Sequence, residues 1–169
     1  EADAVVLAPG AWATEKLMSA APALKHIRPG KGMVAAVELG RTLGPNLRAG
    51  DFYLCQRRED AVLGATLEYD RFDRKVDRSK IAELHAAAEK MLPGEIKLTE
   101  QAWAGIRPMS PDGWPMIGPT AAGILLAAGH SRDGWLMAPI TAEIITAYVF
   151  GNEIPPAWAA LSPERFDHP

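Results

Sequence analysis

The sequence has 169 residues, of which 48% are apolar, and this is enough to bury the core of one domain or of one domain plus part of another. A formal net charge of −3 argues against a nucleic-acid groove, which normally shows a clear excess of basic residues. No run approaches the roughly 20 apolar residues of a membrane span, the first residues lack a signal-peptide pattern, and the single cysteine, Cys55, provides no disulfide or metal cage. We therefore expect a cytoplasmic protein with no nucleic-acid, membrane or metal partner.

The first predicted elements are a buried strand and a short helix. Residues 4–8 form an apolar run that stops at Pro9-Gly10, which is typical of a parallel strand inside a sheet. Such a strand needs neighbours, so they must come from later in the chain or from sequence that precedes this one. Residues 11–21 then predict a helix that ends before Pro22.

The middle of the sequence predicts a sheet. Short runs rich in β-forming residues, separated by glycine, proline and charged clusters, predict an antiparallel meander over residues 31–38, 52–57 and 61–67. We expect Ser79 to cap a helix through residue 92 that lies on this sheet. Residues 96–106 predict a further strand, and the alternating charges of residues 70–80 predict a solvated loop.

The C-terminal part predicts a second buried strand over residues 123–128, followed by a glycine-bounded loop at residues 129–134 and a helix over residues 135–150. This helix is apolar on nearly every side, so we expect it to be buried between layers. The strand-loop-helix unit and the first strand are expected to share one α/β body.

Two sequence blocks resemble the C-terminal half of the FAD-dependent glycine oxidase and D-amino-acid oxidase family, of the thiamine-biosynthesis type. The first block is WAGIRP at residues 103–108 with PDGWPMIG at 111–118, and the second is GHSRDGWLMAP at 129–139. Weaker support comes from residues 8–12 and 28–32. The resemblance covers nearly the whole chain.

The resemblance implies an α+β fold with two parts. A substrate-binding domain with a mixed or antiparallel sheet and helices is expected over residues 27–119. Residues 1–26 and 120–169 are expected to form the C-terminal remnant of a Rossmann-like FAD-binding α/β domain.

The family's FAD domain opens with a G-x-G-x-x-G turn that holds the pyrophosphate at a helix N-terminus. This sequence contains no such turn, and Gly30-Lys31-Gly32 is interpreted only as a loop of similar composition. We therefore expect that an N-terminal FAD-binding segment is missing. FAD is expected as the cofactor of the complete enzyme, with weak or absent binding and no activity in this fragment alone.

Three side chains are implied as catalytic: Tyr53, Arg107 and Arg132. Arg107 is the proposed clamp of the substrate carboxylate, because a guanidinium binds a carboxylate through two parallel hydrogen bonds. Arg132 is expected to contact the flavin ring or the carboxylate, and Tyr53 is expected to offer a phenol near the substrate. The alternatives are a structural ion-pair role for Arg107, an exposed loop arginine for Arg132 and a core role for Tyr53.

The loop at residues 129–134 is expected to place backbone amides and a helix start beside the flavin, where they stabilise negative charge on the reduced ring. His130 is interpreted as a ring that positions this loop, and Asp133 stands where the family commonly has asparagine. The complete set of expected cofactor-binding residues is Ala8, Pro9, Gly10, Trp12, Arg107, Gly129, His130, Ser131, Arg132, Asp133, Gly134 and Trp135.

The implied function is the oxidation of glycine, sarcosine or a small D-amino acid to an imine by hydride transfer to FAD, with reoxidation by oxygen. Two alternatives stay within the flavoproteins: a quinone-linked D-amino-acid dehydrogenase and the oxidoreductase half of a tRNA-modifying enzyme. A third alternative is a non-catalytic fragment or subunit module. The partners expected are a small amino-acid or amine substrate and the missing N-terminal segment, and assembly into a homo-oligomer is left open.

Overall fold

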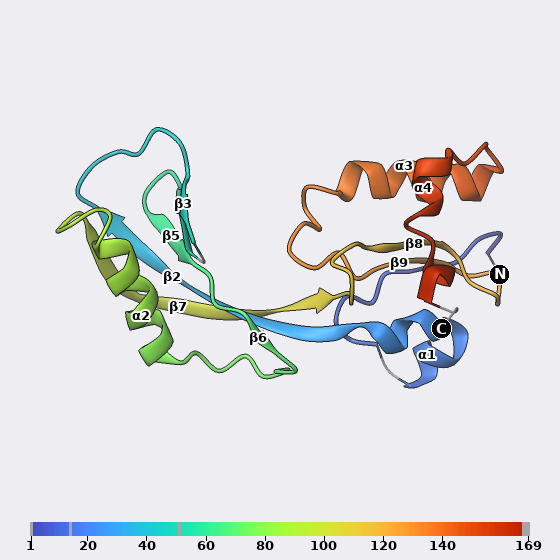
Figure 1. The fold of residues 1–169 in the computed structure, drawn as a ribbon, viewed down its shortest axis with the longest axis horizontal. Helices are drawn as coiled ribbons and strands as arrows, with labels where there is room; N and C mark the ends of the chain where they lie inside the picture. Colours follow the sequence, from blue (N-terminus) through green and yellow to red (C-terminus); the bar gives the residue numbers. More distant parts are fainter. Residues whose placement is uncertain (1, 14, 51, 167–169) are drawn as a thin grey trace. The chain divides into compact units, whose positions relative to one another are not determined.

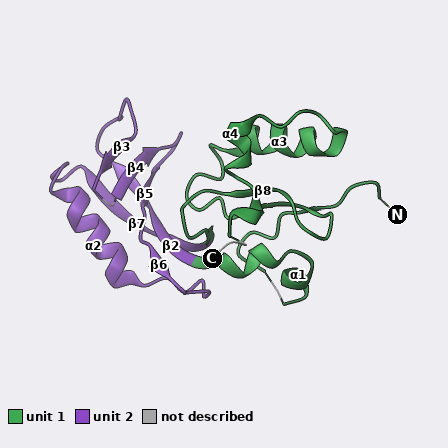
Figure 2. Ribbon diagram, turned by 45° about the vertical axis from the view of Figure 1, so that its right-hand side comes forward, with its two compact units in different colours: residues 1–29, 107–169 green, residues 30–106 purple. Residues whose placement is uncertain are grey.

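The computed structural model describes residues 2–13, 15–50 and 52–166. The chain divides into two compact units, which are distinguished in Figure 2: unit 1 is formed by Glu1–Pro29 and Arg107–Pro169, and unit 2 by Gly30–Ile106. Among the described residues, no helix combines the length and the apolar character needed to cross a bilayer. The division falls at different residues from the expected domain limits, and the assignment of FAD-binding and substrate-binding roles to the two parts stays a prediction.

Unit 1 is built on a three-stranded sheet with the order β1 (Val6–Leu7), β9 (Leu125–Ala128), β8 (Met116–Pro119). Strand β1 pairs in parallel with β9, with Val6 opposite Leu125, and β8 pairs antiparallel with β9. The two apolar runs of the sequence therefore lie side by side, as predicted. Strand β1 is shorter than predicted and less buried, with Val6 43% exposed. The reason is that β9 is the only neighbour of β1 in the described sheet.

Helices cover both faces of this sheet (Figure 1). Helix α1 (Glu15–Ala20) and the 3-10 helix η1 (Pro22–His26) lie on one face, and helix α3 (Ala138–Phe150) lies on the other. The core beneath α1 contains the fully buried side chains of Leu24, Met116 and Leu126. Burying apolar side chains from a sheet against helices is the main stabilising contribution of such a layer.

Arg165 holds the C-terminal elements of unit 1 in place. These elements are α4 (Pro156–Ala159) and the 3-10 helix η2 (Pro163–Phe166). The Arg165 guanidinium donates to both oxygens of Asp112 at 2.8 and 3.2 Å and to the carbonyl of Trp114 at 2.8 Å. These bonds lower the pKa of the Asp112 carboxyl. Asp112 of the PDGW motif therefore holds the end of the described chain against the turn before β8.

Unit 2 contains a sheet with the strand order β3 (Leu47–Ala49), β4 (Phe52–Gln56), β5 (Ala61–Gly64), β2 (Arg28–Leu39), β6 (Glu68–Tyr69), and β7 (Ile96–Met109) also pairs with β2. Neighbouring strands from β3 to β6 pair antiparallel, so the predicted antiparallel pairing is confirmed. The strand order is not that of the predicted meander, because β2 lies between β5 and β6 in the described sheet and not beside β3 or β4. Helix α2 (Arg78–Glu89) covers one face, where its Ala88 packs with Leu54 and Leu63 of the sheet. With helices packed on one sheet of mixed pairing and one antiparallel sheet, the predicted fold class is confirmed.

The predicted cap of α2 was wrong by two residues. Asp77 is the N-cap residue, and its carboxylate accepts hydrogen bonds from the Ser79 backbone N–H at 2.9 Å and the Ser79 hydroxyl at 2.7 Å. These bonds lower the pKa of Asp77. Both residues are good caps, and the aspartate comes first because its oxygen reaches the N–H two positions later.

Several other predicted elements have different limits. Helix α1 begins at Glu15 rather than at residue 11. Residues 9–12 form a turn instead, in which the Trp12 N–H donates to the Pro9 carbonyl at 3.1 Å. Residue 14 lies outside the described residues. Helix α3 begins at Ala138 rather than at residue 135. Residues 30–32 belong to strand β2 and are not a loop.

Helix α3 is not buried between layers, contrary to expectation. Only Ile144 and Ala147 of this helix are buried, and Phe150 is 75% exposed. The sheet of unit 1 lies on one side of the helix (Figure 1), and seven of the thirteen residues of the helix are exposed. Apolar composition alone therefore overestimated the burial of α3.

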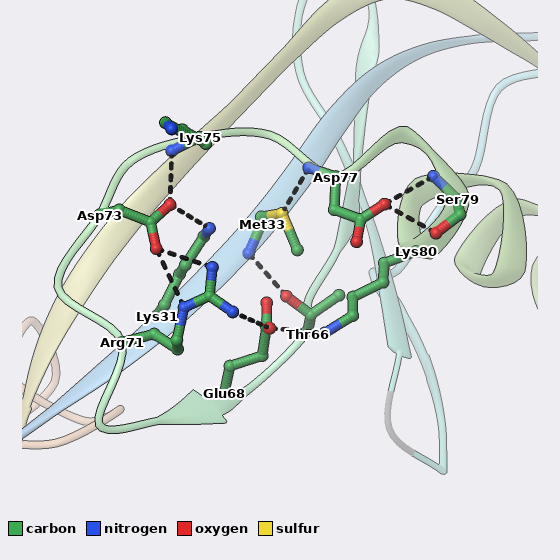
Figure 3. A network of polar contacts seen from close by, with 10 residues as sticks. All are labelled: Lys31, Met33, Thr66, Glu68, Arg71, Asp73, Lys75, Asp77, Ser79 and Lys80. Carbon is green, nitrogen blue, oxygen red and sulfur yellow. Dashed lines mark hydrogen bonds and ion pairs between the residues drawn. The ribbon is translucent and has the colours of Figure 1, made fainter.

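The charged loop before α2 is held by ion pairs instead of being freely solvated (Figure 3). Lys31 on β2 is only 2% exposed, and its ammonium donates to Asp73 at 2.7 Å. Arg71 also binds Asp73, and both cations hold the pKa of this carboxyl well below its usual range. Lys80 of α2 pairs with Glu68 of β6 at 2.5 Å, so charged contacts connect the loop to the sheet and the helix.

Candidate cofactor site and substrate face

The parallel pairing of β1 with β9 brings together two of the predicted cofactor segments. Strand β1 leads directly into Ala8 and Gly10, and β9 leads directly into the loop at residues 129–134. Because the strands run in the same direction, both segments leave the sheet at its carboxyl edge. In open α/β sheets this edge is where ligands bind.

A cavity of about 500 Å³ lies at this edge. Its volume is within the range of roughly 300–1,000 Å³ that is usual for small-molecule and cofactor sites. Four of the residues predicted to bind the cofactor line it, together with the strands and one side of α3. The lining residues are Val6, Ala8, Gly10, Pro108, Ala127, Ala128, His130, Gly134, Ala138, Thr141, Ala142 and Ile145.

Seven of these twelve lining residues are alanine or glycine. Short side chains leave the backbone of the wall accessible, so a flat ring system can come close to the peptide groups. A larger side chain at any of these positions would fill space that a ligand needs. The wall is therefore suited to a large planar apolar group such as a flavin ring.

The loop at residues 129–134 is fixed by backbone hydrogen bonds. Gly129 and Ser131 both have positive φ angles, of 74° and 51°. The Ser131 N–H donates to the Pro108 carbonyl at 2.9 Å, and the Asp133 N–H donates to the His130 carbonyl at 3.0 Å. The loop is thus joined to the chain segment that carries Arg107.

His130 connects this loop to the first turns of α3. The Thr141 hydroxyl donates its single proton to the Met137 carbonyl at 2.8 Å, so it must accept the 2.9 Å bond from His130 Nε2. The neutral ring therefore carries its proton on Nε2. Burial lowers the pKa of His130, which favours this neutral form.

The remaining predicted cofactor residues have varied positions. Pro9 and Trp12 form the turn after β1, with Trp12 47% exposed, and neither lines the cavity. Arg132 and Asp133 are exposed, and Trp135 is 97% exposed. Contacts of these residues with a cofactor stay a prediction.

The predicted catalytic residues belong to different units. Arg107 is half-buried on β7 beside the cavity residue Pro108, and with Arg132 it belongs to unit 1. Tyr53 belongs to unit 2, on the sheet face opposite α2, since its neighbour Leu54 packs toward Ala88 of the helix. A cavity of about 520 Å³ under α2 is lined by Phe52 and other residues, none of which is a predicted site residue.

The sequence interpretation missed the contribution of α3 to the cavity wall. Four of its residues, Ala138, Thr141, Ala142 and Ile145, line the cavity at the spacing i, i+3, i+4, i+7 of one helix face. This stripe of mostly small residues was the available signal. It was hidden because the rest of the helix is also apolar.

The chain belongs to the family of FAD-dependent oxidoreductases called DAO, whose family model matches residues 1–148. The predicted resemblance is therefore confirmed. FAD is the cofactor of this family, and the cavity with its wall of small residues at the strand ends fits the flavin part of that molecule.

Known relatives support the same assignment. The chain is 36% identical to a glycine oxidase of Bacillus licheniformis, over 98% of this chain and 46% of the relative. It is 33% identical to the hydrogen cyanide synthase subunit HcnC of Pseudomonas aeruginosa, over 96% of this chain and 40% of the relative. The crystal structure of glycine oxidase from Geobacillus kaustophilus superposes with a TM-score of 0.83 at 30% identity, over 97% of this chain and 46% of that one. The chain spans less than half the length of these proteins.

Proposed function

We propose that this chain provides part of an FAD-dependent oxidase that converts glycine, sarcosine or a small D-amino acid to the corresponding imine. One observation carries the proposal: the cavity at the carboxyl edge of the β1 and β9 pair is lined by four of the predicted flavin-binding residues, in a chain of the DAO family. The glycine oxidases among its relatives support an amino-acid substrate.

In this proposal the residues of unit 1 hold the flavin. Ala8, Gly10 and Gly134 allow close approach to the backbone, and the first turn of α3 at Ala138 offers the positive end of a helix dipole. When bound, FAD supplies a two-electron acceptor for the α-carbon hydride of an amino acid. The ring of His130 keeps the loop in place through Thr141.

The substrate is held by side chains that fix its carboxylate and its orientation. Arg107 offers two parallel N–H donors to the carboxylate. Tyr53 is proposed to offer a phenol to the substrate. Arg132, in the loop after β9, provides a second positive charge near the flavin. Hydride transfer requires alignment more than acid–base chemistry, so positioning is the main task of these residues.

The test uses the complete enzyme, in which Arg107 is replaced by lysine and by alanine, and compares glycine with methylamine, which lacks the carboxylate. Losing a charge-assisted pair costs about 2–5 kcal/mol, or about 30-fold to several-thousand-fold in kcat/KM. We expect this loss on glycine and a much smaller loss on methylamine, once bound flavin and thermal stability have been checked. Equal losses on both compounds would show that Arg107 is a structural residue.

A second candidate is the quinone-linked alternative left open by the sequence, in which the same oxidation delivers electrons to an acceptor other than oxygen. An oxidase produces hydrogen peroxide from substrate and air alone. Peroxide formed in proportion to glycine consumed would support the oxidase, and turnover only with an added dye or quinone would support the alternative.

A further inference from the structure

Three residues form a row across the sheet of unit 2. Tyr53 on β4 lies opposite Gly64 on β5, and Gly64 lies opposite Val34 on β2. Gly64, which has no side chain, therefore lies between the side chains of Tyr53 and Val34.

The row lies on the face of the sheet opposite α2. In each strand the neighbouring residue packs toward the helix: Leu54 and Leu63 pack with Ala88. Ala35 on β2 packs in the same way with Ile81 of the helix. Since side chains alternate between the faces of a strand, Tyr53, Gly64 and Val34 point to the other face.

The tip of the tyrosine ring occupies the space above Gly64. A Cβ atom added to Gly64 would lie 2.9 Å from both Cζ and Oη of Tyr53 and 2.5 Å from Cγ1 of Val34. Non-bonded carbon atoms are normally separated by about 3.5–4.0 Å. The phenol therefore rests on the strand because residue 64 is glycine, an arrangement in which an aromatic ring covers a glycine in a neighbouring strand.

We propose that Gly64 is a positioning residue for the phenol of Tyr53, and thereby sets where this hydroxyl meets the substrate. This inference rests on the proposed function of Tyr53 in binding the substrate. Any side chain at position 64 moves the hydroxyl away from its place over β5, because the ring is the flexible neighbour. The size of residue 64 then becomes a determinant of which small amino acid is accepted.

The first experiment follows the ring directly by NMR. The chain has three tyrosines, so selective labelling of tyrosine rings gives few signals, and Tyr53→Phe identifies those of Tyr53. Gly64→Ala should shift the Tyr53 signals and leave those of Tyr69 and Tyr148 in place. Gly105→Ala is the matched control, because a Cβ there has no heavy atom within 4 Å.

A second variant separates the two neighbours of Gly64. In Gly64→Ala combined with Val34→Ala, the contact with valine is removed and the contact with the ring stays. Persistence of the Tyr53 shift in this double variant supports the proposal. Unchanged Tyr53 signals in Gly64→Ala, or their return to the parent position in the double variant, would overturn it. Urea titration of each variant confirms that the fold is retained.

The third measurement uses the complete, flavin-loaded enzyme with glycine. Gly64→Ala should raise KM by about three- to tenfold, the size of losing one ordinary hydrogen bond, and Tyr53→Phe should do the same. In the Tyr53→Phe background, Gly64→Ala should add nothing. An equal increase in both backgrounds would overturn the proposal. No change of KM in Tyr53→Phe would instead refute the proposed function of Tyr53, while a displaced ring would still support its positioning by Gly64.

Discussion

The link between His130 and Thr141 makes a quantitative prediction about the loop at residues 129–134. Thr141→Val keeps the shape of the side chain and has nearly the same helix propensity, but it removes the oxygen that accepts the hydrogen bond from His130 Nε2. The ring is then left with a donor that has lost its partner. We expect a loss of stability and a looser loop.

The size of this loss follows from the position of the ring. Leaving a buried donor unsatisfied costs about 1–3 kcal/mol, and the half-buried position of His130 lets water replace part of the lost bond. We therefore expect the lower part of that range, about 1–2 kcal/mol in the free energy of unfolding. The bond from the Thr141 hydroxyl to the Met137 carbonyl is also lost, but this carbonyl still accepts the Thr141 backbone N–H at 2.9 Å.

The control is Thr146→Val on the same helix. The exposed Thr146 side chain makes no hydrogen bond to the described residues, so its replacement should change stability by less than about 0.5 kcal/mol. Urea denaturation measures both variants, and ¹⁵N NMR of the imidazole reports which ring nitrogen carries the proton. Equal stability losses in the two variants, or a proton on Nδ1 in the parent protein, would refute the reasoning.

Three further predictions concern the same unit. Gly129→Ala and Gly123→Ala both place alanine at φ +74°, but only at position 129 would the new Cβ lie 2.9 Å from the Ile27 side chain. Urea titration should therefore show that Gly129→Ala lowers the free energy of unfolding by about 1–3 kcal/mol more than Gly123→Ala does. In the complete enzyme, Ala142→Leu fills the cavity at an exposed position and should weaken FAD binding in a fluorescence titration with little change in stability. Ala147→Leu, at a buried position, should instead lower stability by about 1–3 kcal/mol. Because the pKa of His130 is lowered in the folded chain, the unfolded chain takes up this proton at a higher pH than the folded chain does. The free energy of unfolding should therefore fall as pH decreases below about 6.5. Urea titrations across this pH window should show a shallower decline for His130→Gln than for the parent protein.

Much of the fold could be predicted from the sequence because its strands are short apolar or β-rich runs that end at glycine or proline. The runs at residues 4–8 and 123–128 pair in the sheet of unit 1. The segments after them meet at one edge because parallel strands share a direction. The part of the candidate site that was predicted, Ala8 and Gly10 with His130 and Gly134, depends on this single geometric fact.

The parts that could not be predicted depend on contacts between distant residues. A lysine between two glycines gives no sign that it will be buried, and the partner of Lys31 is Asp73, 42 positions away. The row of Tyr53, Gly64 and Val34 requires the register of three strands, which a shift of one residue would destroy. Sequence patterns describe local periodicity, and neither relation is local.

The composition of the cavity wall also explains why α3 was misinterpreted. A helix stripe that faces a protein core is normally filled by large side chains, whose contacts provide stability. The stripe of α3 at the cavity consists of Ala138, Thr141, Ala142 and Ile145, and these residues leave the space open. An exposed apolar stripe of small residues is costly for the chain by itself, but it becomes useful when a flat ligand covers it. The low burial of α3 and the proposed flavin site are therefore two consequences of the same choice of residues.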